Sequence, residues 1–181
     1  FDIAIVDPPY FNGPNNSNYY GNDKSQNDVK RLNKKIKSWN LPTKEYFEHL
    51  FRVSKEQIIW GVNYFIDIYD FGPGRIIWDK VNKSSTFSDC EIAYTSFHDS
   101  TKLFRYMWNG MLQGKSIKEG HIPQGNKKLN EKRIHPTQKP VKIYKLLLKE
   151  YAEPGMKILD THVGSASSLI ACHDYCCPFI G

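Results

Sequence analysis

Short apolar runs alternate with polar segments along the chain, and turn-forming residues separate them. The first run, Phe1 to Val6, is rich in branched side chains and stops at Asp7-Pro8-Pro9, as a buried parallel strand would. Similar runs predict further strands at 57–61, 75–78, 90–97, 103–108, 157–160 and 178–180. The run at 90–97 alternates more and reads as a strand with one wetter face. We expect the strand at 103–108 to pair with it.

Helical spacing accounts for most of the rest. Four apolar residues between 46 and 51 repeat at the helical period, and Thr43 before them is a suitable N-cap. A helix is predicted over 141–151, since Pro140 stands where the first turn tolerates proline, and another over 165–174. Strands and helices that alternate with short connections predict an α/β fold, a mixed and mostly parallel sheet in one domain.

Composition fits one globular domain. The chain has 181 residues, of which 40% are hydrophobic, which is too apolar for a disordered protein. The apolar runs are too short to span a membrane, and no secretory segment opens the chain. The four cysteines match no disulfide framework, so we expect a reducing cytoplasm. Three of them, with a histidine, lie at 172–177, where we expect core packing rather than a metal site.

The net charge of +6 is concentrated in two segments. Residues 12–44 carry seven basic and two acidic side chains, and residues 101–133 carry eight basic and two acidic ones. Two positive insertions on a mildly acidic body indicate a polyanion held at particular faces. Solvated lysine-rich loops would give the same counts, so charge alone leaves both interpretations open.

Three segments are candidates for chemistry. Asp7-Pro8-Pro9-Tyr10 follows a strand directly, and ligands in doubly wound sheets bind beyond the carboxyl ends of strands. Residues 158–168 turn from a strand into a helix through Gly164, where the backbone can approach a ligand closely. The third segment, 135–140, reads His-Pro-Thr-Gln-Lys-Pro and precedes a helix. Ordinary turns and helix caps would use the same residue types.

In this order the three segments resemble the β-class of DNA amino-methyltransferases, whose hallmark is Asp-Pro-Pro-Tyr. Weaker matches at 60–64, 76–80 and 91–94 extend the resemblance over nearly the whole chain. The second segment is similar to that family's Asp-Pro-Phe-x-Gly-Ser-Gly-Thr-Thr loop. It departs from this pattern at Thr161, His162 and Ala166.

The resemblance implies the Rossmann-like fold of S-adenosylmethionine-dependent methyltransferases and no need for a metal. The residues that it assigns to the cofactor are Asp160, His162, Gly164, Ser165, His135, Thr137 and Lys139. Asp160 would meet the ammonium group of the cofactor, and Lys139 or the start of the helix that follows it would attract the carboxylate. The family also has parts before Phe1 and beyond Gly181, so we take the chain as a trimmed core and expect it to bind cofactor poorly.

The resemblance also gives Asp7, Pro8, Pro9 and Tyr10 their roles. An aromatic amine is a poor nucleophile because its lone pair is delocalised into the ring. Acceptors for both of its N–H bonds, here the Asp7 carboxylate and the Pro8 carbonyl, return density to nitrogen. Two prolines fix φ and so the direction of that carbonyl. Tyr10 would stack on a base flipped out of the duplex.

We therefore expect methyl transfer to N6 of adenine in DNA by a bacterial or phage-encoded enzyme. Aspartate at the first motif position favours adenine, because the cytosine-N4 enzymes of the family more often have serine there. Segments 12–44 and 101–133 would straddle the DNA. The alternatives are a cytosine-N4 enzyme, a catalytically silent DNA-binding relative, and an enzyme that acts on RNA or a protein amide. The departures from the family pattern within residues 158–168 would fit the silent relative. No membrane is implied, and the oligomeric state stays open, a homodimer included.

Overall fold

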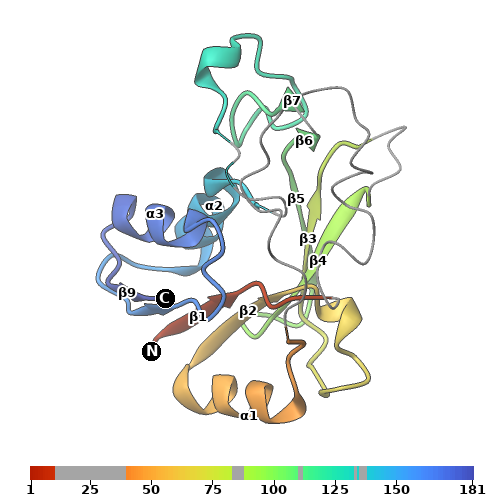
Figure 1. Cartoon of the computed structure of the whole chain (residues 1–181), viewed down its shortest axis with the longest axis vertical. Coiled ribbons are helices and arrows are strands. Elements are labelled where there is room, and N and C mark those ends of the chain that lie inside the picture. Colours follow the sequence, from red (N-terminus) through yellow and green to blue (C-terminus); the bar gives the residue numbers. More distant parts are fainter. Residues whose placement is uncertain (11–39, 83–87, 110–111, 133, 135–137) are drawn as a thin grey trace.

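Seven strands form one sheet in the computed structural model, which describes residues 1–10, 40–82, 88–109, 112–132, 134 and 138–181. The strands are β1 (Ile3–Val6), β2 (Glu56–Trp60), β3 (Arg75–Asp79), β4 (Cys90–Thr95), β5 (Thr101–Arg105), β8 (Ile158–Leu159) and β9 (Phe179–Ile180). Their order across the sheet is β5-β3-β4-β2-β1-β8-β9 (Figure 1). Of these seven strands, β4 alone is antiparallel to its neighbours, which confirms the predicted mixed, mostly parallel sheet.

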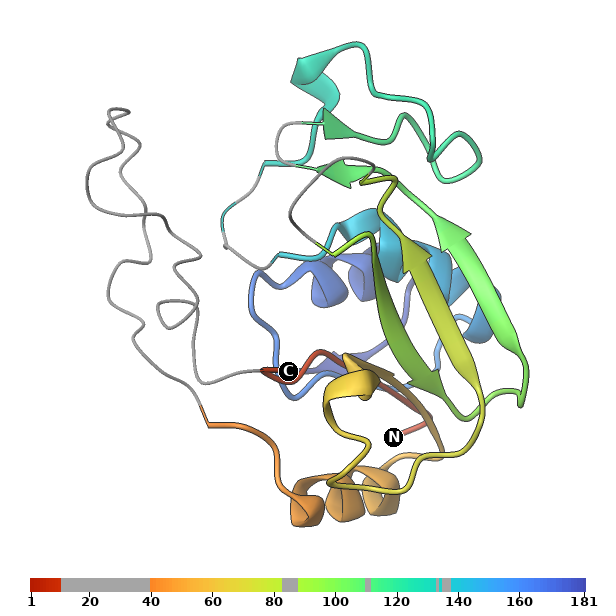
Figure 2. The ribbon, with the colours of Figure 1, turned by 90° about the vertical axis from the view of Figure 1, so that its right-hand side faces the viewer.

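Helices cover both faces of this sheet. The helix α1 (Lys44–Val53) lies on one face, and α2 (Val141–Tyr151) and α3 (Ser167–Asp174) lie on the other (Figures 1 and 2). The remaining short elements are η2 (Val62–Tyr64), β6 (Trp108–Asn109), β7 (Leu112–Gln113) and η3 (Lys127–Leu129). The segment with β7 and η3 extends past one end of the sheet (Figure 2). No helix within the described ranges has the length and apolar character to cross a membrane.

One predicted pairing is wrong. The strand expected at 103–108 does not pair with the strand at 90–97. Instead β5 pairs in parallel with β3, where Leu103 is opposite Ile77. Both edges of β4 are already occupied, by β3 and by β2, so the outer edge of β3 is the one left for β5. The chain leaves this sheet after Arg105, and Trp108 belongs to the separate β6–β7 pair.

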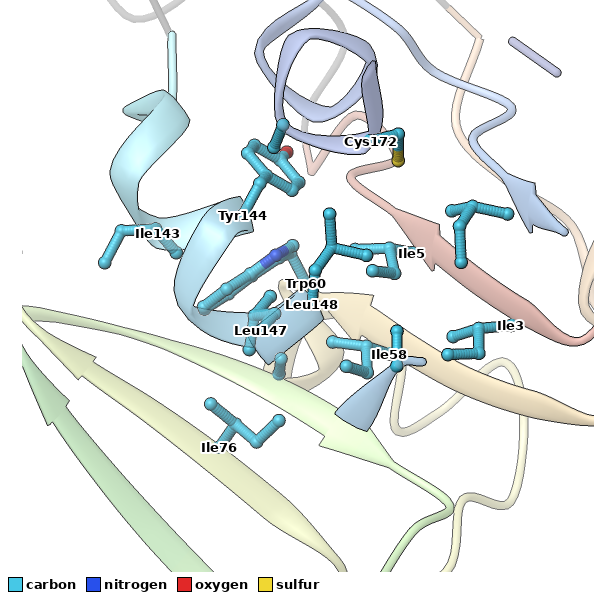
Figure 3. Packing of buried hydrophobic residues seen from close by; sticks show 14 of the residues in the cluster. Ile3, Ile5, Ile58, Trp60, Ile76, Ile143, Tyr144, Leu147, Leu148 and Cys172 are labelled. Carbon is cyan, nitrogen blue, oxygen red and sulfur yellow. The ribbon is translucent and has the colours of Figure 1, made fainter. Parts of the chain in front are cut away.

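Alternation along the strands builds a core on each face. Ile3 and Ile5 pack in the cluster with α2 and α3, whereas Ala4 and Val6 pack in the cluster with α1. Figure 3 shows the first cluster, where strand residues lie against α2 and α3. Burial on both faces explains why the first run of the sequence is apolar throughout rather than alternating.

The structure confirms two of the predicted helix starts, and the third helix begins later than predicted. The Thr43 hydroxyl accepts a hydrogen bond from the Tyr46 N–H at 3.4 Å, which confirms it as the N-cap of α1. Pro140 precedes α2 as predicted. The helix expected from residue 165 begins at Ser167, because Gly164 and Ala166 have φ of +53° and +60° and hold the preceding residues in a turn.

The packing predicts a difference between two leucines. Leu147 of α2 is 0% exposed against the sheet, whereas Leu129 of η3 is 64% exposed. Leu147→Ala should lower the free energy of unfolding by about 2–5 kcal/mol, since it leaves a cavity. Leu129→Ala should change it by less than about 0.5 kcal/mol. Urea denaturation measures both, and similar losses would contradict this core.

Candidate functional site

Residues of all three candidate segments meet at one edge of the sheet, where its parallel strands end. Residues 7–10 follow β1 and residues 160–165 follow β8, and these strands are adjacent and parallel, with Ile3 opposite Ile158. The strand β4 runs the other way, so its first residues, Glu91 among them, lie at this same edge. Side chains from distant parts of the sequence therefore converge here.

A buried ammonium group lies at the centre of this edge. The Lys139 Nζ lies 2.5 Å from Oδ2 of Asp7 and 2.8 Å from Oε2 of Glu91. It also donates a hydrogen bond to the Tyr10 hydroxyl at 2.9 Å, and its side chain is only 4% exposed. The other oxygen of Glu91 pairs with Lys80 Nζ at 2.5 Å. Asp7, Lys139, Glu91 and Lys80 are thus in contact one after another, and their charges alternate in sign.

The charges of these four residues stabilise one another. Burial alone would raise the pKa of Glu91, but Lys139 and Lys80 outweigh it and lower that pKa to about 2. Burial alone would lower the pKa of Lys139, but Asp7 and Glu91 outweigh it and raise that pKa above its ordinary 10.5. Both groups are therefore charged at neutral pH. Removal of one partner would leave a buried charge uncompensated.

This position differs from the one that the resemblance implies for Lys139. Its ammonium was expected at the carboxylate of a cofactor, whereas it pairs with Asp7 and Glu91. Sequence reasoning also missed Glu91 and Lys80 as site residues. The signal that could have found them was weak, since each lies in one of the minor matches, 76–80 and 91–94.

Tyr10 is fixed by its ring and by its hydroxyl. The hydroxyl donates to Oδ1 of Asp7 at 2.5 Å, and the ring stacks on Tyr64 with centroids 4.9 Å apart. Burial and the nearby Asp7 charge raise the pKa of Tyr10 well above its usual range, which keeps the hydroxyl protonated. Gly61 makes room for this ring, because a Cβ there would lie 2.0 Å from it.

The turn after β8 is organised around the buried carboxylate of Asp160. One oxygen accepts the backbone N–H of His162 at 2.9 Å, and the other accepts the Ser168 hydroxyl. Burial raises the pKa of Asp160 above its ordinary 3.8. A Cβ added at Gly164 would meet only the His162 carbonyl, at 3.8 Å, so the backbone there is open to a ligand.

The unusual residues of this turn attach it to α1. The Tyr46 hydroxyl lies 2.7 Å from the Thr161 hydroxyl, and its ring meets the His162 ring edge-on, with centroids 5.4 Å apart. Burial lowers the pKa of His162, so its imidazole is neutral at pH 7. The Ser165 hydroxyl lies 2.8 Å from that of Ser167, at the start of α3.

One buried side chain links the two halves of the edge. Tyr144 of α2 has a pKa well above its usual range because of burial, and because the negative charges of Asp7 and Asp160 both act on it. The Asp7 charge also acts on Asp160 and His162. Residues 7–10 and the turn after β8 therefore share one electrostatic environment. His135 and Thr137, which were predicted to join them, lie outside the described residues.

The other predictions concern a metal site, the cysteines and the basic segments. Within the described ranges no cluster of three or more His, Cys, Asp or Glu residues could bind a metal. Cys172 and Cys177 are buried in the core with α2 and α3, and burial raises the pKa of Cys172 to about 12. Five lysines are exposed on the segment that extends past the sheet, Lys115, Lys118, Lys127, Lys128 and Lys132.

Comparisons with known proteins agree with this architecture. The model of one family, described as DNA methylase, matches residues 1–181. The solved structure of M1.HpyAVI with SAM is 19% identical to this chain and has a TM-score of 0.56. The match covers 99% of this chain and 80% of the M1.HpyAVI chain. The structure of TTHA0409 from Thermus thermophilus, complexed with S-adenosyl-L-methionine, is 12% identical to this chain and has a TM-score of 0.50. The match covers 99% of this chain and 78% of TTHA0409. Both likenesses concern the fold. A search of curated proteins finds no match.

Glu91 should make the free energy of unfolding depend on pH in the acidic range. Its folded pKa of about 2 lies below the ordinary 4.5, so its contribution is fully present above about pH 4.5 and is lost as the pH falls towards 2. The difference corresponds to on the order of 3 kcal/mol. Glu91→Gln should therefore flatten the dependence of the unfolding free energy on pH in this window, as urea denaturation would measure.

The control for this experiment is Glu119→Gln. Glu119 belongs to an exposed pair with Lys115, and such pairs contribute little because water screens them. Glu119→Gln should alter the slope of the unfolding free energy against pH less than Glu91→Gln does. An unchanged slope in Glu91→Gln would refute the proposed stabilisation of this carboxylate.

Ala166 offers a test of the turn geometry. Its φ of +60° lies in the left-handed region, which costs a residue with a Cβ about 1–2 kcal/mol. Ala166→Gly should raise the free energy of unfolding by about 0.5–1 kcal/mol, after the larger entropy loss of glycine is subtracted. Ala171→Gly, inside α3, should lower it by about 1 kcal/mol or more. Thermal unfolding of both variants measures this, and a loss in Ala166→Gly would contradict the left-handed turn.

Proposed function

We propose that this chain, which belongs to the DNA methylase family, transfers a methyl group from S-adenosylmethionine to N6 of adenine in DNA. The observation that carries the proposal is the parallel pairing of β1 with β8. It brings residues 7–10 and residues 160–165 to the same edge of the sheet. A target amine and a methyl donor have to meet at contact distance, and this edge is where segments suited to each lie together.

Asp7 and Pro8 act on the target amine. The Asp7 carboxylate and the Pro8 carbonyl accept its two N–H bonds and so return electron density to the nitrogen. Each Asp7 oxygen already accepts one donor, and a carboxylate has about four lone-pair sites, so a further N–H can be accepted. The methyl carbon would exchange its bond to sulfur for a bond to nitrogen, with S-adenosylhomocysteine as the leaving group, and the Asp7 carboxylate would take the proton that the nitrogen loses.

Residues of the turn after β8 fit the methyl donor. Asp160 keeps lone pairs for an ammonium group, since each of its oxygens accepts a single hydrogen bond. Gly164 leaves the backbone open, and the neutral ring of His162 offers a flat face. S-adenosylmethionine, when bound, supplies the activated methyl group, while the residues of the chain orient it and the amine.

Tyr10 is the platform for the base. Chemistry on a paired base requires that the base leave the stack and enter the site, where an aromatic ring can hold it. Tyr64 now covers one face of the Tyr10 ring and is itself 53% exposed, so it can move when a base arrives.

DNA would lie against the basic segments. The exposed lysines of 115–132 extend past the sheet and suit phosphates, which position a duplex without reading its sequence. Segment 12–44, the other basic insertion, lies largely outside the described residues, and its role rests on its charge. Adenine is favoured over cytosine by Asp7, in the place where cytosine-N4 enzymes more often have serine.

Methyl transfer from labelled S-adenosylmethionine to DNA tests this function. The unmodified full-length protein should label DNA, and digestion should yield N6-methyladenine. Asp7→Ala should lower the rate by about 10²-fold or more, because an acceptor aimed at the reacting amine is lost. The matched control is Asp174→Ala, which removes an aspartate from an exposed pair with Lys145 and should keep the rate.

Each other outcome selects a different function. N4-methylcytosine in the digest would identify a cytosine-N4 enzyme. Label found only in RNA, or only in protein, would identify that molecule as the substrate in place of DNA. No label in any of them would favour a silent DNA-binding relative. Transfer that survives Asp7→Ala would remove the mechanism.

A further inference from the structure

We propose that Lys139 is a positioning residue for Asp7 rather than a cofactor ligand, and that Glu91 and Lys80 hold it in place. The inference deepens the proposed function and rests on it, because it takes Asp7 as the acceptor for the amine. It assigns a role in the reaction to three residues that lie far from Asp7 in sequence.

The first argument is the hydrogen-bonding capacity of the ammonium group. A lysine ammonium has three N–H donors and no acceptor. Lys139 has three partners within hydrogen-bond distance, which are Asp7 Oδ2, Glu91 Oε2 and the Tyr10 hydroxyl. Its hydrogen bond to Tyr10 and its ion pairs with Asp7 and Glu91 therefore lie inside the protein. A cofactor carboxylate would have to displace one of them from a side chain that is 4% exposed.

The second argument is the effect on Asp7. Its Oδ1 is held by the Tyr10 hydroxyl and its Oδ2 by Lys139, so the carboxylate is fixed at both oxygens. An acceptor that is already oriented needs no reorganisation when the amine arrives, which is how fixed charges contribute most to a reaction.

The third argument is the rigidity of the support. Glu91 is a residue of β4, inside the sheet, and it joins Lys139 to Lys80, which directly follows β3. The ammonium group also lies 5.4 Å from the ring centroid of Trp60, a fully buried residue at the end of β2. The lysine is thus held by the sheet, whereas Asp7 lies in the segment that follows β1.

These contacts predict opposite effects of two variants on the pH profile. The ionisable groups around Asp7 are Lys139, Tyr10 and Glu91, with Tyr144, Asp160 and His162 beside them. Lys139→Met leaves carboxylates facing one another, so they take up a proton more readily and the acid limb of activity moves to higher pH. Glu91→Gln removes a negative charge, so that limb moves to lower pH. A general loss of structure would not give shifts of opposite sign.

The experiment compares Lys139→Met, Lys139→Arg and Glu91→Gln with the unmodified protein. It measures kcat and KM for DNA across pH, together with calorimetric binding of S-adenosylhomocysteine and of 5′-methylthioadenosine. The second ligand shares the adenosine and thioether groups but lacks both the carboxylate and the ammonium group. Lys145→Met, in an exposed pair with Asp174, is the control, and thermal unfolding verifies that each variant is folded.

We expect Lys139→Met to lower kcat by about 10²-fold and Glu91→Gln by about tenfold, with limb shifts of opposite sign. Lys139→Arg should recover part of kcat, because it restores the charge. Binding of both ligands should change by less than about threefold. If Lys139→Met does not fold, Glu91→Gln alone decides, through its kcat and the direction of its shift.

Two results would overturn the inference alone. The first is a loss of about tenfold or more in S-adenosylhomocysteine binding by Lys139→Met, with 5′-methylthioadenosine unaffected, which would make Lys139 a ligand of the carboxylate. The second is unchanged kcat and pH limb in folded variants, while Asp7→Ala is inactive. Absence of methyl transfer by the unmodified protein would defeat both this inference and the proposed function.

Discussion

Parallel pairing between β1 and β8 is the constraint on which the site depends. Strands that run side by side in the same direction end at the same edge, so whatever follows them is brought together whatever its separation in sequence. Residues 7–10 come from one end of the chain and residues 160–165 from the other. Their proximity is thus fixed by the sheet, and the loops between them are free to differ without moving either segment.

Charge neutralisation is the second constraint at this edge. Lys139, Glu91 and Lys80 come from three separate segments and could not be buried singly, because an uncompensated charge away from water is costly. Together with Asp7 they form an alternating chain in which each charge has an opposite neighbour. The same contacts that make burial tolerable also fix the Asp7 carboxylate. Stability and the orientation of the Asp7 carboxylate are therefore coupled at this edge.

Local patterns predicted most of the fold and part of the site. Apolar runs located β1 and β8, and Thr43 marked the start of α1, because each signal lies within a few residues. The pairing of β5 was wrong, since strand order depends on which sheet edges are already occupied. The partners of Lys139 were missed for a similar reason, because an ion pair between remote segments has no local signature. Ala166 shows the limit at a single position, where the turn imposes a left-handed φ that alanine does not favour.

The proposed function requires that the methyl donor and the target amine meet where β1 and β8 end. A crystal structure of the protein with sinefungin, a donor analogue that carries an amine in place of the methyl-sulfonium centre, tests this most directly. The analogue should contact the turn at 160–165 and direct the amine that replaces the methyl-sulfonium centre towards Asp7. An analogue bound away from the carboxyl ends of these two strands would contradict it.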